Sequence, residues 1–350
     1  MTAASLARFF HIKGSEVERY YKHHLSDFKT WSQKEHATDW VLLADNLGAC
    51  CSIDETSLCN EVYTIVSNKA GHGKKGSVIA IVKGTKANVV SAVLKKIPES
   101  EREKVTEITM DFSDSMFSIA KQCFPKATIV IDCFHIVQRL CEGLEEMRLR
   151  FKRLAVTESK KEAAAFAQNE DRKAKQRAYY RKKHPRNKKE RRGRKRIRKQ
   201  KYKPTLLANG ETKVEMLTRS RNMLAQSGDK WGDSKKERAR ILFGQYPQMK
   251  EAYSLICKVR AIFKSHITRK EAKEKLHEWY KEVNACTLRE IKAARNAIKG
   301  KEKYVLNYFL NRSTNAAAES LNSKIKGFRA QLHGIADIPF FLYRVCTIFG

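Results

Sequence analysis

The chain has 350 residues, enough for one large domain or two ordinary ones, and its hydrophobic share of 42% predicts that most of it folds. It carries 71 Lys and Arg against 38 Asp and Glu, a formal net charge of +33. Such an excess attracts polyanions, and the basic residues flank no apolar span, so charge favours a nucleic acid as partner over a membrane. Charge alone leaves open a non-catalytic basic nucleic-acid-binding protein.

The cysteines and the apolar runs exclude several other classes of protein. Nine cysteines, irregularly spaced and without a C-x-x-C pair, predict neither a disulfide framework nor a zinc knuckle built from this chain alone. No apolar run reaches the ~20 residues of a membrane helix, and the first residues do not resemble a signal peptide. We therefore expect reduced thiols, a cytoplasmic location and no membrane contact.

Residues 1–36 are expected to form a partial helical DNA-binding region. Ser5 can cap a first short helix, and a second helix follows Gly14. Two helices joined by a glycine-containing turn are compatible with part of a helix-turn-helix, although any two-helix segment would look the same.

Residues 37–157 have an α/β pattern. The runs WVLLADNL and ACCSIDETSL predict at least one strand, and VYTIVSN, GSVIAIVKG, VTEITMDF and ATIVIDCF predict one each. Helices are expected over KANVVSAVLKKI, at about 114–123 and from about 136 onward. Three antiparallel strands followed by two parallel ones resemble the RNase H arrangement, so we expect an α/β fold with a mixed five-stranded sheet.

Residues 158–310 are expected to form a basic helical insertion, and 311–350 to complete the core. From Arg181 to Lys203 there are fifteen Lys or Arg and one acid, Glu190. A charge run is usually a solvated face, but this one lies between two folded halves, so we expect it to contact DNA. The candidate DNA-binding residues are Arg181, Lys182, Lys183, Arg186, Lys188, Lys189, Arg191, Arg192, Arg194, Lys195, Arg196, Arg198 and Lys199.

Three acids stand at the ends of predicted strands. Asp54 lies in ACCSIDET, Asp111 ends VTEITMD, and Asp132 ends ATIVID, three residues before His135. The carboxyl ends of parallel strands are the usual place for a site in an open α/β sheet. Taken singly, each acid is better explained as a surface or turn residue. Three of them in one basic domain favour a cation-binding cluster.

The late segment TNAAAESLNSKIKGF predicts a helix with one polar face. Asn315, Glu319, Asn322 and Lys326 recur at spacings of four, three and four residues, so they share that face. A glutamate between two asparagines, with a lysine nearby, suits a metal ligand beside a phosphate backbone. A solvated amphipathic helix is the commoner object with this pattern.

Two longer blocks resemble a known family. TMDFSDSMFSIAKQCFPKATIVIDCFHIVQRL and NRSTNAAAESLNSKIKGFRAQLHG are similar to the signature blocks of DDE transposases of the ISL-three insertion-sequence family, and SIDETSL to the block of the first aspartate. The resemblance implies Asp54, Asp111 and Glu319 as catalytic, metal-binding carboxylates, with Asp132 and His135 as an Asp-x-x-His element. Asp132 remains an alternative to Asp111 as second ligand.

The resemblance also implies the fold and the chemistry. It predicts an RNase H-like core with a large all-helical insertion before the last catalytic helix, and metal-dependent cleavage and strand transfer of DNA. Two Mg²⁺ ions, replaceable by Mn²⁺, would act in a homodimer on transposon ends and target DNA, in the bacterial nucleoid. The chain lacks the family's N-terminal zinc-binding segment, which is typical of a split-gene subgroup with a second, end-recognising polypeptide. The rival enzyme is an RNase H-like nuclease that does not join strands.

Overall fold

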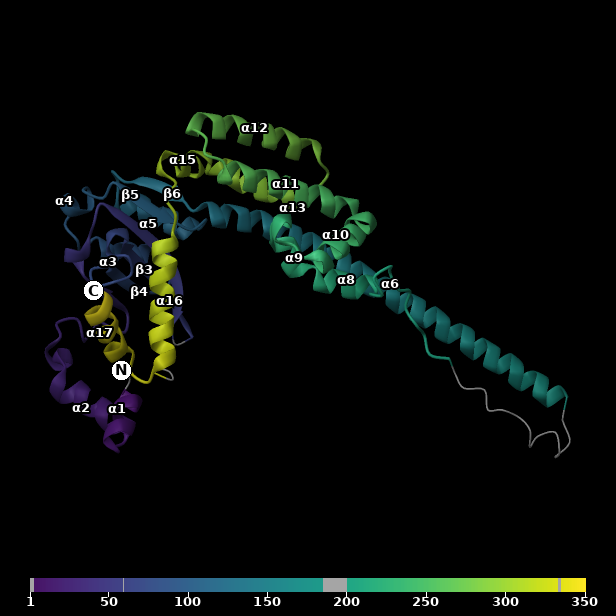
Figure 1. Cartoon of the computed structure of the whole chain (residues 1–350), viewed down its shortest axis with the longest axis horizontal. Coiled ribbons are helices and arrows are strands. Elements are labelled where there is room, and N and C mark those ends of the chain that lie inside the picture. The colour runs from purple at the N-terminus through teal and green to yellow at the C-terminus, as the bar shows by residue number, and fades with distance from the viewer. Residues whose placement is uncertain (1–2, 59, 185–199, 333–334) are drawn as a thin grey trace. The chain divides into compact units, whose positions relative to one another are not determined.

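The structure is a computed structural model that describes residues 3–58, 60–184, 200–332 and 335–350, and it divides into two compact units (Figure 1). The first unit contains the chain up to Ile136, Ser265–Lys275 and Ile298–Gly350, and the second contains Val137–Lys264 and Leu276–Ala297. The composition changes near residue 158, but one continuous helix, α6 (Cys133–Lys183), runs through that position. The unit boundary therefore lies earlier, near residue 136.

The first unit is built on a six-stranded mixed sheet in the order β1-β4-β3-β2-β5-β6. Neighbours among the first four strands in this order are antiparallel, whereas β5 joins β2 and β6 joins β5 in parallel. The strands are β1 (Trp40–Leu42), β2 (Cys50–Leu58), β3 (Glu61–Asn68), β4 (Val78–Lys83), β5 (Glu107–Met110) and β6 (Thr128–Ile131).

The predicted α/β class and mixed sheet are confirmed, but the predicted count of five strands was wrong. The sixth strand is β1, in which Trp40 and Leu42 lie opposite Val82 and Ala80 of β4. Only the first part of WVLLADNL is extended, because the chain turns at Ala44–Asn46 before β2 begins.

Short helices connect the parallel part of the sheet. They are α3 (Ala87–Leu94), α4 (Glu99–Arg102) and α5 (Asp114–Cys123). Ser113 caps α5 by accepting a hydrogen bond from the backbone N–H of Met116. Asp114 in the first turn adds a favourable charge at the positive end of the helix dipole.

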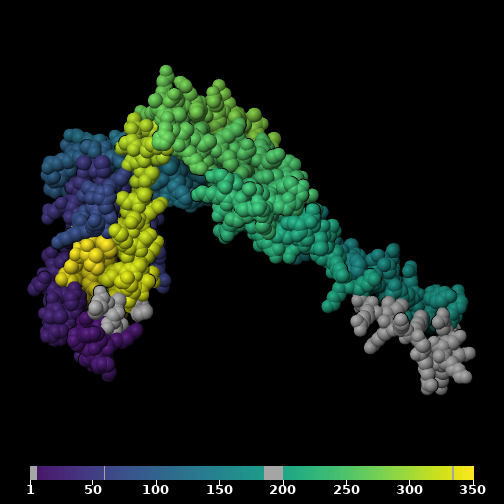
Figure 2. Space-filling model, in the orientation of Figure 1, coloured from purple at the N-terminus to yellow at the C-terminus, as the bar shows by residue number. Residues whose placement is uncertain are grey.

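Two late helices return to the sheet. α16 (Ala316–Gln331) contacts β2 and crosses in front of the sheet in Figure 1, and α17 (Ile338–Phe349) follows it. Leu321 and Ile325 of α16 belong to one buried cluster with Tyr63 and Ile65 of β3. Burial of each such side chain stabilises the fold by about 1.5–3 kcal/mol. The outer side of α16 lies at the surface, as Figure 2 shows in yellow.

The N-terminal helices pack on the end of the chain. They are α1 (Ala3–Phe10) and α2 (Gly14–Tyr20), followed by a π-turn at Tyr21–Leu25 and a 3-10 turn at Asp27–Thr30. Lys22 forms an ion pair with Asp337, and the ring of Phe28 packs on that of Phe340. Two helices are thus present in residues 1–36, as expected, but the predicted cap at Ser5 was wrong, because α1 begins at Ala3 and Ser5 lies within it.

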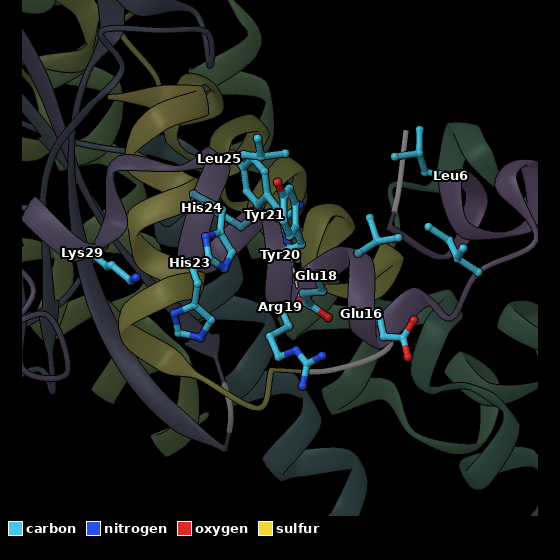
Figure 3. A pocket seen from close by; sticks show the side chains of 13 residues that line it. Leu6, Glu16, Glu18, Arg19, Tyr20, Tyr21, His23, His24, Leu25 and Lys29 are labelled. Atoms are coloured by element: carbon cyan, nitrogen blue, oxygen red, sulfur yellow. Dashed lines mark ion pairs between the residues drawn. The ribbon is translucent and has the colours of Figure 1, made fainter.

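A pocket of about 1100 Å³ lies among these N-terminal helices (Figure 3). Apolar and basic side chains line it, including Leu6, Tyr20, Leu25, Arg19 and Lys29. All of its lining residues lie between positions 6 and 29, except Arg344. The pocket is therefore separate from the acids at the strand ends.

Helices make up most of the described part of the second unit. Besides most of α6, it contains α8 (Lys213–Arg219), α9 (Arg221–Ala225), α10 (Asp233–Gln245), α11 (Pro247–Lys264) and parts of α12 (Arg269–Ala285) and α13 (Arg289–Gly300). Trp279 is 2% exposed and donates to the carbonyl of Leu255. The first unit also holds two short helices, α14 (Glu302–Val305) and α15 (Tyr308–Asn311).

The basic run lies only partly within the described residues. Arg181, Lys182 and Lys183 form the last turn of α6. The other candidate DNA-binding residues lie outside the described part of the chain: Arg186, Lys188, Lys189, Arg191, Arg192, Arg194, Lys195, Arg196, Arg198 and Lys199.

Candidate active site

The three acids predicted at strand ends lie in one row across neighbouring parallel strands, but only Asp111 and Asp132 follow the end of a strand, since Asp54 lies within β2. Ile53 of β2 is the partner of Met110 of β5, and Met110 is the partner of Ile131 of β6. Asp54, Asp111 and Asp132 each follow one of these residues directly. Because side chains alternate between the faces of a sheet, the register directs all three carboxylates to the same face.

Asp54 is buried and is held in its metal-free position by an asparagine of α16. Its side chain accepts hydrogen bonds from the backbone N–H of Glu55 (2.8 Å) and from Nδ2 of Asn322 (2.6 Å). Burial, followed by the negative charge of Asp111, raises the pKa of Asp54 from 3.8 to about 6. The two carboxylates are therefore close enough to repel each other.

Asp111 is paired with the histidine of the predicted Asp-x-x-His element. His135 Nε2 lies 2.7 Å from Asp111 Oδ1, and both side chains are partly exposed, at 19% and 23%. Burial alone lowers the pKa of His135, but the hydrogen bond and charge of Asp111, with smaller contributions from Asp132 and Asp54, raise it above its ordinary value. Asp54, Asp111 and Asp132, which we call the acidic row, thus stabilise the positive form of His135.

Asp132 is 3% exposed and both of its oxygens accept hydrogen bonds from backbone groups. Oδ1 accepts from the N–H of Phe134 (2.7 Å), at the start of α6, and Oδ2 accepts from the N–H of Asn315 (2.6 Å), directly before α16. Because both of its oxygens have hydrogen-bond partners, this buried carboxylate links the starts of α6 and α16 to the end of β6.

Asn315 is fully buried and touches all three strands of the row. Its Nδ2 donates to Asp111 Oδ1 (3.2 Å) and to the carbonyl of Ile53 (3.4 Å), and its Oδ1 accepts from Thr109 Oγ1 (3.5 Å). Together with the bond from its N–H to Asp132, these contacts fix the start of α16 against the acidic row.

Glu319 is exposed in the first turn of α16, between the two asparagines that contact the acids. Asn315 precedes it by four residues and Asn322 follows it by three, so the three side chains share one helix face. The helix that carries Glu319 contacts Asp111 and Asp54 through these two asparagines, whereas Glu319 itself is exposed. Lys326, one turn beyond Asn322, is exposed.

With this arrangement described, the chain can be compared with known families. A family model described as a transposase, of the DDE type and the ISL-three group, matches residues 51–345. The chain belongs to this transposase family. The resemblance of the two sequence blocks is thereby confirmed. No curated protein and no solved structure gives a significant match to the chain.

Membership of this family gives the substrate and the class of reaction. The protein is an insertion-sequence transposase, which acts on DNA in transposition and recombination. DDE transposases generally use divalent metal ions. None of the helices in the described ranges is both long and apolar enough to cross a membrane.

The donor set of the transposase fits a divalent ion. Asp54 is buried beside a second acid, and Asn322 Oδ1 is a buried atom without a hydrogen-bond partner. Oxygen ligands of this kind are those that Mg²⁺ prefers. Within the described residues, no three His, Cys, Asp or Glu side chains are yet grouped closely enough to hold a metal ion. Instead, Asn322 donates a hydrogen bond to Asp54, and His135 pairs with Asp111.

Several polar residues beneath the acidic row were not predicted from the sequence. Ser52 Oγ lies 2.7 Å from Thr109 Oγ1, and Thr109 also donates to the carbonyl of Cys51. Two residues earlier on β5, Glu107 is buried. The signal was present, because Glu107, Thr109 and Asp111 alternate with Ile108 and Met110 in the strand.

Proposed function

We propose that Asp54, Asp111 and Glu319 are the three catalytic carboxylates of this transposase and hold two Mg²⁺ ions, which Mn²⁺ can replace. The observation that carries the proposal is the pair of asparagines on either side of Glu319. Asn322 contacts Asp54 and Asn315 contacts Asp111, although more than 200 residues separate the helix from these strands. The attachment of α16 to both aspartates, on either side of Glu319 in the sequence, supports Glu319 as the third carboxylate.

Asp111, rather than Asp132, is the second ligand in this proposal. Both oxygens of Asp132 are already bonded to backbone N–H groups, and Asp132 is 3% exposed. Removing it from these donors would leave two buried N–H groups unsatisfied, at a cost of about 1–3 kcal/mol each. Among the described residues, the Asp111 carboxylate has two side-chain partners, Asn315 and His135, and the partly exposed His135 can turn away when a ligand arrives.

The reaction is phosphoryl transfer in two steps. Water attacks a phosphodiester to nick the DNA, and the freed 3′-hydroxyl then attacks the target strand. When bound, magnesium supplies Lewis-acid stabilisation of the attacking and leaving oxygens. His135, once released from Asp111, contacts the scissile strand, where the negative charge of a phosphate favours the positive form of its ring.

The fold supports the same assignment. The strand order β4-β3-β2-β5-β6, with three antiparallel strands followed by two parallel ones, is that of an RNase H-like core, to which β1 adds an edge. In such a core the first and fourth strands, here β2 and β5, carry the first two acids. The helical residues between α6 and α14 form the insertion that precedes the catalytic helix.

The insertion holds DNA in this proposal. Its basic run, of which Arg181, Lys182 and Lys183 end α6, contacts phosphates and contributes affinity without reading sequence. We further propose that two copies act together, because two transposon ends must be cut, and that a second polypeptide recognises those ends.

The test is a cleavage and joining assay on labelled transposon-end DNA with Mg²⁺. Asp54→Ala, Asp111→Ala and Glu319→Gln should each lower nicking by about a thousand-fold or more, since each removes several kcal/mol of charge stabilisation. DNA affinity should remain, or rise slightly, because negative charge is lost. Glu237→Gln, at an exposed acid paired with Arg240 in the second unit, is the matched control and should retain activity.

Two results would contradict the proposal. If the Glu319→Gln protein nicked DNA as fast as wild type, Glu319 and its helix α16 would have no part in the chemistry. Nicked products without any joined product, in the presence of target DNA and the end-recognising polypeptide, would favour a nuclease that does not transfer strands.

A further inference from the structure

A polar seam leads from the acidic row along β5 to the segment before α16. We use the name polar seam for Glu107, Thr109 and Asp111 on the strand and Asn311, Ser313 and Asn315 on the segment. In each set the residues alternate along the chain. Asn311 and Ser313 both donate hydrogen bonds to Glu107, and Asn315 contacts Thr109 and Asp111. The segment is therefore joined to the strand at Glu107 by Asn311 and Ser313, and at Thr109 and Asp111 by Asn315.

Glu107 lies at the end of the polar seam farthest from Asp111, and hydrogen bonds hold its carboxylate in place. It is 7% exposed, and Oε1 accepts from Ser313 and from Lys69 Nζ at 3.2 Å, while Oε2 accepts from Asn311. Burial raises the pKa of Glu107, but the hydrogen bonds from Ser313 and Asn311 and the charge of Lys69 lower it more, so the carboxyl is ionised. A buried charge requires such partners, and it therefore holds the segment in one place.

α16 has a second attachment to the same part of the sheet. Lys324 Nζ donates to the carbonyl of Gly73 at 2.7 Å, in the turn between β3 and β4. Lys69, which pairs with Glu107 and contacts Ser313, precedes that turn. One end of the β3–β4 connection thus contacts the start of the segment, and its tip contacts the middle of the helix.

We propose that Glu107 is a positioning residue, which through Asn311 and Ser313 sets the place of Glu319 along the acidic row. The inference rests on the proposed role of Glu319 as a metal ligand. Glu107 is not itself in contact with the acids, since it lies four residues before Asp111. Loss of its carboxylate frees the segment that precedes α16, and Glu319 then meets Asp54 and Asp111 less often in the correct geometry.

The experiment compares Glu107→Ala with Glu211→Ala. Glu211 is a matched control in the second unit, because it is 6% exposed and accepts hydrogen bonds from an asparagine, Asn209, and from Arg219 and Arg238. Both substitutions remove a buried, ionised glutamate. Only one of them lies on the polar seam.

Three quantities are measured on the full-length protein. The first is amide hydrogen exchange of residues 316–322 without metal or DNA, the second is affinity for end DNA, and the third is the Mg²⁺ concentration that gives half-maximal nicking. Glu107→Ala should speed exchange in α16 by about tenfold and raise the half-maximal Mg²⁺ concentration by about tenfold, with unchanged DNA affinity. Glu211→Ala should alter none of the three.

The outcomes separate the inference from the proposed function. Unchanged exchange in α16 with Glu107→Ala overturns the inference, whether or not the wild type nicks DNA. Faster exchange with an unchanged Mg²⁺ requirement also overturns it, because the helix would then be loosened without effect on the metal site. If Glu107→Ala does not fold, Glu107→Gln keeps the side-chain volume and should show the same two changes to a smaller degree; a Gln variant identical to wild type overturns the inference.

Discussion

At the scale of single residues, the proposed chemistry depends on one buried acid that is destabilised when ionised. Asp54 is 8% exposed, and its pKa of about 6 shows that burial and the charge of Asp111 outweigh the hydrogen bonds from Glu55 and Asn322. A divalent cation removes the repulsion. The same strain that makes the metal-free site unfavourable therefore increases its affinity for metal.

The pH dependence of stability follows from this shift. Between about pH 4 and pH 6 the folded protein keeps the proton of Asp54, whereas the unfolded chain has released it. The stabilisation from this carboxyl is complete below about pH 4 and is lost as the pH rises through 6. A shift of this size corresponds to about 3 kcal/mol.

Asp54→Asn should therefore make the metal-free protein more stable at neutral pH. The amide carries no charge, and Asn322 can turn its unpartnered Oδ1 toward it. We expect the free energy of unfolding to rise by about 2–3 kcal/mol at about pH 7.5 and to change little at about pH 4. Urea unfolding in chelator at both pH values measures this. A variant less stable than wild type at about pH 7.5 would show that ionised Asp54 is not destabilising.

At the scale of elements, α16 is the helix that completes the candidate site. Its apolar side, with Leu321 and Ile325, packs into the core, and its polar side carries Asn315, Glu319 and Asn322. Asp132 sets its start, because one carboxylate joins the first turn of α6 to the residue before α16.

Asp132→Asn tests that role. The amide places an N–H donor against one of two backbone N–H donors, so we expect a loss of about 1–3 kcal/mol in stability. The Mg²⁺ concentration for half-maximal nicking should stay near that of wild type, whereas Asp111→Asn should raise it strongly. Thermal unfolding and metal titration of nicking measure the two effects. If Asp132→Asn raised the half-maximal Mg²⁺ concentration strongly and Asp111→Asn left it near that of wild type, Asp132 would be the second ligand.

The sequence predicted the parts of the site but not the contacts between them. Strand ends placed Asp54, Asp111 and Asp132, and helical spacing placed Glu319 between two asparagines, because both patterns are local. The bond of Asn322 to Asp54 joins positions 268 residues apart. The periodicity of apolar and polar residues in the sequence does not predict such a long-range contact. The edge strand β1 was missed as a separate sixth strand because its pairing with β4 is also a tertiary contact.

At the scale of the whole molecule, charge and chemistry are separated along the chain. The net charge is +33, yet the candidate site is a row of carboxylates in the first unit, while the densest basic run follows α6. In the proposed function, the basic residues of this run attract DNA and the acids of the first unit bind cations.

Neutralising the end of α6 should weaken DNA binding without altering chemistry. The triple change Arg181→Gln, Lys182→Gln and Lys183→Gln removes up to three phosphate contacts. We expect the slope of log affinity against log salt concentration to fall by up to about 3, since each contact contributes about 0.9. Nicking at saturating protein should be unchanged. Fluorescence anisotropy over a salt series measures the slope, and an unaltered slope would remove this turn from the interface.

The most direct test of the central claim is anomalous scattering from Mn²⁺ in crystals of the transposase bound to end DNA. The account predicts manganese between Asp54, Asp111 and Glu319, with Asn322 and His135 moved off the two aspartates. Manganese bound by Asp132, or bound at Asp54 and Asp111 with Glu319 directed to solvent, would contradict it.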